Sequence, residues 1–248
     1  MAGKNKSMIF GRHPVMDASQ AGKPFEKLIL QLGVRGEFEK EIRHLSSLYN
    51  IPMTVVPKER MGRFTQKNHQ GIIGFLSAMP YYLIEDVMPM IYEKSEVPLI
   101  LILDGVTDVR NFGAIARSAE CCGVHTIVIP NKGSAGITED ALKTSAGALT
   151  KIPVCREYSL AKTIDFLELS GIQVFASRLG ATDALYDLDL TVPTAIVMGS
   201  EGDGVSQALL KKVRNHFIIP QLGTTNSFNV SVASGIILYE AVRQRIKI

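Results

Sequence analysis

The chain has 248 residues, of which 46% are hydrophobic and 21% are charged. This composition is typical of a globular protein with one large or two smaller domains, and no apolar run approaches the roughly 18 residues that a membrane span needs. The first residues lack the apolar core of a secretory signal, so we expect a cytoplasmic protein without a membrane partner.

The net charge of +3 is distributed unevenly. Residues 1–80 contain 12 Lys and Arg against 6 Asp and Glu, whereas residues 81–248 contain 15 against 18. A basic excess in the first third suits a polyanion such as RNA, although it is also common on solvated surfaces. The three cysteines, Cys121, Cys122 and Cys155, form no C-x-x-C pair, so we expect no disulfide framework and no metal site and interpret them as packing residues.

Residues 1–80 predict a small α/β domain. Apolar runs at 28–30, 53–56 and 71–76 indicate strands, and residues 37–49 have helical spacing. Exposed candidates for binding RNA are Arg12, His13, Lys58, Glu59, Arg60, Arg63, Lys67, Asn68, His69 and Gln70, although ordinary surface charge is the simpler interpretation of any single one. Residues 81–97 are expected to connect this domain to the next and, being apolar, to pack on a neighbour.

From residue 98 onward, apolar runs alternate with helical patterns. Strands are predicted at 99–103, 126–129, 173–176, 195–198 and 217–219, and helices at 112–122, 139–149, 160–169 and 206–213, before a final helix. Val, Ile and Leu runs between helices indicate a parallel sheet covered on both faces. In such sheets ligands bind beyond the carboxyl ends of the strands, where three unusual loops fall.

The first loop, residues 104–113, enters a helix. Asn111 lies at the mouth of that helix and Arg117 lies six residues on, so both can face the strand ends. A helix cap is the alternative interpretation of Asn111, and a surface residue that extends its charge into water is the alternative for Arg117. The small residues around Arg117 favour close packing, so we do not expect this side chain to be wholly exposed.

The second loop, residues 199–206, has the pattern G-x-x-G-x-G. This spacing matches neither the dinucleotide motif nor a phosphate loop. The carboxylates of Glu201 and Asp203 argue for a ligand that is neutral or cationic.

The third loop, residues 219–229, joins a strand to the last helix. Its Gly, Thr, Asn and Ser residues offer backbone groups and short polar side chains to a ligand. The alternative is that Ser227 or Asn229 caps the helix. In that helix the apolar residues Val232, Ile236, Ile237, Tyr239 and Val242 recur at roughly helical spacing.

Together these loops resemble the three motifs of the SpoU, or TrmH-type, 2′-O-ribose methyltransferases of the SPOUT class. The matching stretches are Asn111-x-x-x-x-x-Arg117, Met198-Gly-x-Glu-Gly-x-Gly-x-Ser206 and Ile219-Pro-x-x-Gly-x-x-x-Ser-Phe-Asn-Val-Ser-Val-Ala233. Residues 9–15 and 69–72 resemble the substrate-binding domain of the RlmB-like enzymes, which methylate a guanosine in large-subunit (23S) ribosomal RNA. The resemblance covers nearly the whole chain.

The resemblance implies an architecture that periodicity does not show. A SPOUT domain with a deep trefoil knot would occupy residues 98–248, after an N-terminal RNA substrate-binding domain at 1–80 and a linker at 81–97. It also implies a homodimer whose active site lies near the subunit interface, with S-adenosylmethionine as methyl donor and ribosomal RNA as substrate.

The resemblance also implies the site residues. The catalytic set would be Arg117, Asn111, Glu201, Ser227 and Asn229. The cofactor-binding set would be Gly199, Ile219, Gln221 and Phe228, where Phe228 replaces the usual Leu of the family. Because a guanidinium is effectively never deprotonated in proteins, we expect Arg117 to stabilise the developing alkoxide and not to act as a base.

Three alternatives remain open from the sequence. A transfer-RNA ribose methyltransferase of the same family is disfavoured by the basic N-terminal domain. An RNA-binding ribosome assembly factor with an inactive site is opposed by the presence of all five catalytic residues. A nicotinamide dehydrogenase is remote, because the glycine spacing is wrong.

Overall fold

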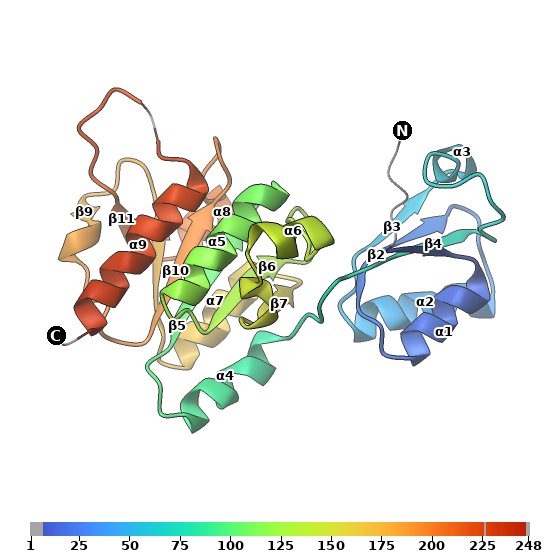
Figure 1. Ribbon diagram of the computed structural model, residues 1–248, viewed down its shortest axis with the longest axis horizontal. Coiled ribbons are helices and arrows are strands. Elements are labelled where there is room, and N and C mark those ends of the chain that lie inside the picture. Colours follow the sequence, from blue (N-terminus) through green and yellow to red (C-terminus); the bar gives the residue numbers. More distant parts are fainter. Residues whose placement is uncertain (1–6, 226, 247–248) are drawn as a thin grey trace. The chain divides into compact units, whose positions relative to one another are not determined.

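The computed structural model describes residues 7–225 and 227–246, which form two compact units. The first unit runs up to Pro80 and includes Gly136–Thr138, and the second comprises Tyr81–Ala135 and the chain from Glu139 onward. Each unit has its own sheet (Figure 1). Among the described residues, no helix combines the length and apolar character needed to cross a membrane.

The first unit contains a four-stranded sheet of order β1-β4-β2-β3, in which only β2 and β3 are parallel. Its elements are β1 (Met8–Phe10), α1 (Arg12–Gln20), β2 (Phe25–Gln31), α2 (Glu37–Leu48), β3 (Met53–Val56), α3 (Lys58–Met61) and β4 (Ile72–Leu76). The predicted strands at 28–30, 53–56 and 71–76 and the predicted helix are confirmed. The sequence pattern missed β1, which has only three residues, and the helices α1 and α3.

Alternation along β2 divides the core of the first unit. Leu28 and Leu30 are buried with Ile42 of α2, whereas Ile29 between them is buried with Met61 of α3. Successive side chains of a strand point to opposite faces, so β2 is covered on both sides.

The second unit contains a seven-stranded parallel sheet of order β7-β6-β5-β10-β8-β11-β9. Its strands are β5 (Leu99–Asp104), β6 (Thr126–Pro130), β7 (Val154–Glu157), β8 (Gln173–Ser177), β9 (Asp183–Ala184), β10 (Thr194–Gly199) and β11 (Asn215–Ile218). Its helices are α4 (Ile84–Glu93), α5 (Val109–Cys121), α6 (Glu139–Thr144), α7 (Leu160–Leu169), α8 (Gln207–Lys212) and α9 (Val230–Arg245), with 3-10 turns η1 (Ala148–Thr150) and η2 (Leu185–Asp187). The predicted α/β class with a parallel sheet is confirmed.

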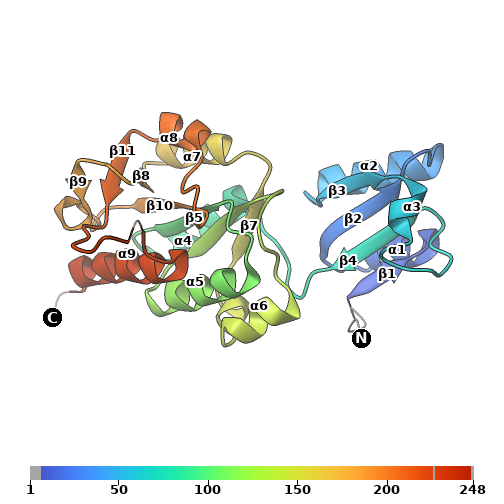
Figure 2. The ribbon, with the colours of Figure 1, turned by 90° about the horizontal axis from the view of Figure 1, so that it is seen from above.

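Helices cover both faces of this sheet, with α5, α6 and α9 on one side and α7 and α8 on the other (Figure 2). On the α7 side, Ile100 and Ile102 of β5 pack in one buried cluster with residues of α4, α7 and α8. The sequence missed β7, because Arg156 and Glu157 break its apolar run although both are buried. The predicted helix at 139–149 ends early at Thr144, and Gly147 then adopts a positive φ of 85°.

Residues 81–97 belong to the compact second unit. Helix α4 buries Ile84, Val87, Met88 and Ile91 in the cluster shared with α7 and α8. This apolar face explains why the segment is ordered against the sheet. The trefoil knot implied by the family resemblance stays a prediction.

The last helix was predicted correctly, but its buried face was not. Its buried residues are Val230, Ser234, Ile237, Leu238 and Ala241. Three other apolar side chains of the helix are exposed: Val232, Ile236 and Tyr239 are 51%, 37% and 66% exposed. The helix is therefore apolar on both sides, and the spacing of its apolar residues alone did not decide which side faces the sheet.

Candidate active site

The loops that line the candidate site follow neighbouring strands of the second sheet. Strands β5, β10, β8 and β11 stand side by side in that order and run in the same direction. Their carboxyl ends therefore meet at one edge, as expected for a ligand site in a parallel sheet. The three loops predicted from the sequence follow β5, β10 and β11, and the loop after β8 lies between the last two.

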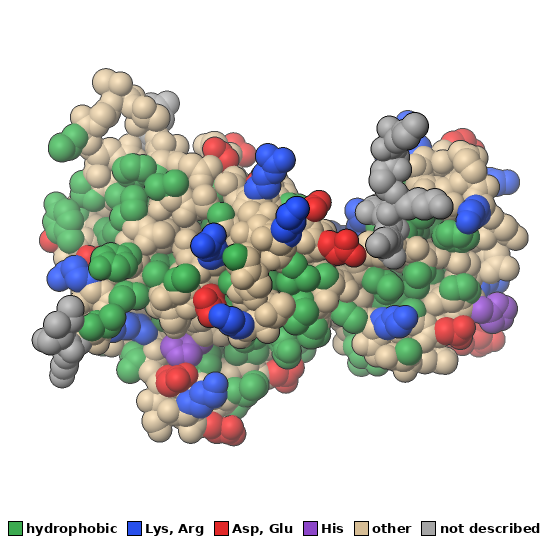
Figure 3. Space-filling view, in the orientation of Figure 1, with side chains coloured by type: hydrophobic (Ala, Val, Ile, Leu, Met, Phe, Trp, Pro, Cys, Tyr) green, Lys and Arg blue, Asp and Glu red, His purple; other side chains and the backbone are tan. Residues whose placement is uncertain are grey.

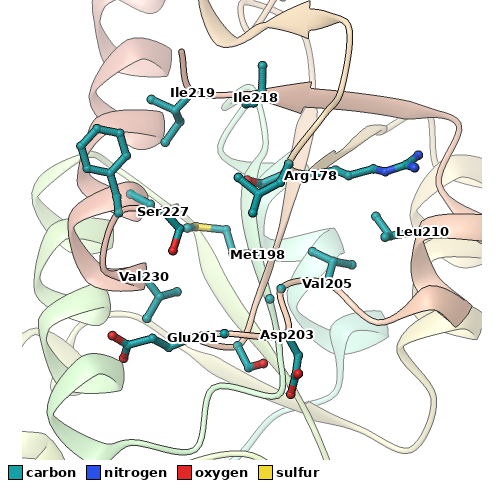
Figure 4. A pocket seen from close by; sticks show the side chains of 18 of the residues that line it. Arg178, Met198, Glu201, Asp203, Val205, Leu210, Ile218, Ile219, Ser227 and Val230 are labelled. Carbon is teal, nitrogen blue, oxygen red and sulfur yellow. The ribbon is translucent and has the colours of Figure 1, made fainter. Parts of the chain in front are cut away.

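A cavity of about 360 Å³ opens at this edge (Figure 4). Six of the predicted site residues line it, namely Gly199, Glu201, Ile219, Gln221, Ser227 and Phe228. Apolar walls come from Met198, Val205, Ile218 and Val230. The volume is within the range of small-molecule sites, and apolar walls with a few polar groups are typical of them. Asn226, in the third loop, lies outside the described residues.

Three predicted residues form one polar network beside the cavity. The Asn111 side-chain amide donates to Glu201 Oε2 at 3.1 Å, and Asn229 Nδ2 lies 3.2 Å from Asn111 Oδ1 and 3.5 Å from Glu201 Oε1. This network joins all three loops. Because the Glu201 carboxylate accepts from two amides, its orientation is fixed without a cation.

The network also decides between the alternative interpretations of the two asparagines. Asn229 is indeed the N-cap of α9, since its Oδ1 accepts from Ser231 N at 2.9 Å, and its amide group is left for the network. Asn111 is not a cap. That position is taken by Asp108, whose Oδ1 accepts from Asn111 N at 2.7 Å.

Backbone contacts close the second loop tightly. Ser200 and Gly204 exchange two backbone hydrogen bonds of 3.1 Å, and Ser206 N donates to Asp104 Oδ2 at 2.7 Å. A Cβ atom added at Gly199 would lie 1.8 Å from the backbone carbon of Gly204. Only glycine fits at this position, so the loop can fold back over the end of β10.

Arg117 does not line the cavity of the single chain. Arg117 is an exposed residue of α5, although its small neighbours favour close packing. Six residues correspond to a rotation of about 240° around a helix, so Arg117 and Asn111 cannot share a face. Arg117 instead falls in line with the exposed residues Arg110 and Cys121. No hydrogen bond or ion pair of Arg117 is formed within the described part of the chain.

The sequence pattern missed the loop after β8. Ser177, Arg178 and Leu179 line the cavity together with the predicted residues. The loop reaches the cavity because it follows a strand that lies between β10 and β11 in the sheet. Strand order is a property of the tertiary structure, however, and it does not follow from the order of the strands along the chain.

A second concave surface, which we call the basic cleft, lies in the first unit and has a volume of about 760 Å³. Its lining includes six basic or imidazole side chains, Arg12, His13, Arg35, Lys58, Lys67 and His69, and no Asp or Glu among the described residues. Gln70 ties two sides of the cleft together, since its Oε1 accepts from Arg12 N at 2.9 Å. No carboxylate of the described chain pairs with these cations.

The cysteines differ in their surroundings. Cys155 is buried, as expected, and burial raises the pKa of its thiol to about 12. Cys121 is exposed, so its interpretation as a packing residue is wrong. It lies on the outward side of α5, where packing does not constrain the residue. Within the described ranges, no three His, Cys, Asp or Glu side chains are grouped to hold a metal ion.

Comparisons with known proteins agree with this geometry. Residues 98–239 match the SpoU rRNA Methylase family, and residues 8–82 match the domain described as RNA 2′-O ribose methyltransferase substrate binding. A curated relative from Staphylococcus aureus strain MSSA476, which carries the name of a TrmH family tRNA/rRNA methyltransferase, is 34% identical over 96% of both chains.

Solved structures show a similar fold. The AdoMet-bound rRNA methyltransferase from Sinorhizobium meliloti has a TM-score of 0.62 at 23% identity, covering 97% of this chain and 88% of that one. The A. aeolicus TrmH/SpoU tRNA modifying enzyme has a TM-score of 0.56 at 31% identity, covering 60% of this chain and 76% of that one. The first of these similarities concerns the fold alone.

Proposed function

Because the chain belongs to the SpoU family of RNA 2′-O-ribose methyltransferases, we propose that it methylates the ribose 2′-hydroxyl of a guanosine in large-subunit ribosomal RNA. The observation that carries the proposal is one cavity lined by the second and third family motifs, with Asn111 of the first motif tied to them by the Asn111–Glu201–Asn229 network. S-Adenosylmethionine, the methyl donor of the family, supplies an electrophilic methyl group when bound.

The residues of the cavity fit this donor. Ile219 and Phe228 offer apolar surface to an aromatic base, while the close-packed backbone at Gly199 offers hydrogen-bonding groups without a side chain in the way. Glu201 and Asp203 bring two carboxylates to the cavity (Figure 4). Negative charge suits a ligand that carries a sulfonium, and the donor bound to the Sinorhizobium meliloti relative supports the assignment.

The chain's polar residues would align the sugar and stabilise charge. We assign to Arg117 the stabilisation of the developing alkoxide and of a neighbouring phosphate. Negative charge builds up on the ribose oxygen in the transition state, so a positive group beside it lowers the activation barrier. Asn111 would orient the ribose or phosphate. Glu201, Ser227 and Asn229 would hold the loops and the polar edges of the donor in place, and the proton would leave to a phosphate oxygen or water.

A second copy of the chain would complete the site. The outward face of α9 presents Val232, Ile236 and Tyr239, and Figure 3 shows hydrophobic side chains gathered over this helix. A helix that is apolar on both sides is normally buried on both sides. Since Arg117 lies outside the cavity of its own chain, we propose that the homodimer brings it to the donor site of the partner.

The basic cleft supports RNA as the substrate. Four Lys and Arg side chains that form no ion pair within the described part of the chain create a field that attracts phosphate groups, and His13 and His69 add hydrogen-bonding groups. The cleft lies within residues 8–82, which match the family's substrate-binding domain. The 31% identity to the A. aeolicus tRNA modifying enzyme keeps transfer RNA as a second candidate substrate.

The substrate is tested by incubating the full chain with methyl-labelled S-adenosylmethionine and total RNA, then separating large-subunit RNA, small-subunit RNA and transfer RNA. We expect label in the large-subunit fraction, on a ribose 2′-oxygen of guanosine after nuclease digestion. Label in transfer RNA alone would move the assignment to the second candidate. Binding of ribosomal RNA without label in any fraction would indicate an inactive assembly factor.

A further inference from the structure

We call the cavity of about 360 Å³ in the second unit the donor cavity, because we propose that the methyl donor binds there. Charged side chains are distributed unevenly around it. Among the described residues that line it, Glu201 and Asp203 are the carboxylates and Arg178 is the one Lys or Arg. No ion pair joins Arg178 to either carboxylate within 4.0 Å. In Figure 4, the Arg178 side chain extends on the Leu210 side of the cavity, away from Ser227 and Glu201. The cavity therefore has an anionic part and a separate cationic part.

The backbone of Arg178 is anchored while its guanidinium is uncommitted. Its N–H donates to the carbonyl of Phe217 at 2.9 Å, which continues the pairing of β8 with β11. Its side chain is exposed and makes no hydrogen bond, ion pair or ring contact within the described part of the chain. Because the backbone of Arg178 is fixed and its guanidinium has no partner in the described chain, the guanidinium is available to a ligand. The five N–H donors of a guanidinium have a fixed geometry that suits a carboxylate.

The donor of the proposed function carries charges that match this arrangement. S-Adenosylmethionine has a sulfonium and an ammonium, both positive, and one carboxylate. The cavity has the complementary charges, with two carboxylates for the two positive groups and one guanidinium for the carboxylate of the donor. A cavity with Glu201 and Asp203 alone would attract the two cationic groups but would repel the carboxylate at the same end of the molecule.

We propose that Arg178 binds the carboxylate of the methyl donor and makes the cavity selective for donors that carry one. This inference rests on the proposed function, because it takes S-adenosylmethionine as the ligand. A phosphate of the RNA substrate is the other anion that a guanidinium could meet here. The position of Arg178 among the residues that line the cavity, at the end of a sheet strand, favours the smaller ligand.

The test compares two ligands and three proteins by isothermal titration calorimetry on the full chain without RNA. The ligands are S-adenosylmethionine and its decarboxylated form, which lacks only the carboxylate. The proteins are the unchanged chain, Arg178→Gln and Arg178→Lys. Arg43→Gln is the matched control, since Arg43 is an exposed arginine of the first unit that pairs with Glu39.

We expect Arg178→Gln to weaken the binding of S-adenosylmethionine roughly tenfold or more and to leave the decarboxylated ligand within about threefold, since a charged hydrogen-bonded pair of this kind contributes about that much. Arg178→Lys should recover part of the loss. Arg43→Gln should bind both ligands as the unchanged chain does. Circular dichroism melts verify that each variant is folded.

Equal weakening of both ligands by Arg178→Gln would overturn the inference, because the side chain would then support the cavity wall. Unchanged donor binding with a raised KM for RNA would overturn it in favour of a phosphate contact. If the unchanged chain binds neither ligand, the proposed function itself fails. These results are distinguishable, because only the last one concerns the unchanged protein.

Discussion

The donor cavity of the second unit and the basic cleft of the first unit are both concave, but they are built from different chemistry. The cavity combines apolar walls with two carboxylates, of which Glu201 accepts hydrogen bonds from the amides of Asn111 and Asn229. The cleft has twice the volume, about 760 Å³ against about 360 Å³, and its charged side chains are all basic among the described residues. One surface suits a small cation of defined shape and the other a large polyanion.

The difference teaches how the two ligands would be selected. Shape and a few buried polar contacts discriminate small molecules, and such contacts are screened little by salt. Contacts between an exposed surface and phosphate groups orient a nucleic acid but do not distinguish its sequence. These contacts weaken steeply as the salt concentration rises. Changes in the cavity should therefore alter donor binding or turnover, and changes in the cleft should alter the salt dependence of RNA binding.

The largest effect is expected from Arg117→Ala. Loss of a group that stabilises an oxyanion costs on the order of 10²- to 10³-fold in kcat. Because we assign Arg117 to the alkoxide and a neighbouring phosphate and not to the methyl donor, the Kd of S-adenosylmethionine should stay nearly constant. Single-turnover methylation and calorimetry measure the two quantities separately. A kcat within tenfold of the unchanged chain would show that the role is misassigned.

Mixed dimers refine this prediction. If Arg117 serves the partner's cavity, subunits carrying Arg117→Ala and subunits carrying Gly199→Ala should each be weakly active alone but should regain activity when refolded together. One site of the mixed dimer then has an intact cavity and an intact arginine. No recovery on mixing would place the arginine in the site of its own subunit.

The next largest effect is expected from Gly199→Ala. The added Cβ would lie 1.8 Å from backbone carbon of Gly204, so the second loop must move. Overpacking of this kind costs about 1–3 kcal/mol, which corresponds to roughly a 5- to 150-fold loss of donor affinity. Gly223→Ala is the matched control, since nothing lies within 4 Å of a Cβ there and its φ is not positive. Equal donor affinity of both variants would contradict the close-packed loop.

A smaller effect is expected from the double variant Arg35→Ala and Lys58→Ala in the basic cleft. Removing two phosphate contacts should flatten the slope of log K against log salt for RNA by roughly 1.4, at about 0.7 for each contact with a single strand. Donor affinity should not change. The control removes two charges from α2 of the same unit, with Lys40→Ala and Arg43→Ala, and should leave the slope near its original value. The reverse pattern would move the RNA surface to α2.

The smallest effect is expected from Glu157→Gln. Glu157 lines neither the cavity nor the cleft, so this variant tests whether a substitution elsewhere changes stability without changing donor affinity. Burial raises the pKa of Glu157 above its ordinary 4.5, opposed by the hydrogen bond from Ile84 N and helped by Glu85 and Asp86. A raised pKa means that its contribution to stability is present below pH 4.5 and is lost as the pH rises through the folded value. Gln keeps an acceptor for Ile84 N, at 2.8 Å in the unchanged chain, without the charge.

The variant should therefore melt higher than the unchanged chain at pH 7, by roughly 2 °C, and the difference should shrink at pH 4. Thermal melts at both pH values measure it, and donor affinity should be unchanged. A difference that grows toward pH 4 would contradict the assigned direction of the pKa shift.

The sequence predicted most of the longer strands and helices, because the spacing of apolar residues along an element reflects which of its sides is buried. The pattern was misleading where a buried strand carries charged residues, as at Arg156 and Glu157 of β7, and where a helix has apolar residues on both its buried and its exposed side, as in α9. Of the residues that the motifs group together, Gly199, Ile219 and Phe228 line one cavity. The same motifs placed Arg117 with them, although it faces outward from α5.

By itself, the sequence determined the α/β class, most of the longer strands and helices, and the three loops that carry polar and glycine residues. Tertiary structure alone decided that β8 inserts between β10 and β11, which brings Arg178 to the cavity. It also decided that Asn111 and Asn229, which are 118 residues apart, share a hydrogen bond. Spacing along a chain records which side of its own element a residue occupies. Which elements become neighbours depends on the packing of the whole sheet.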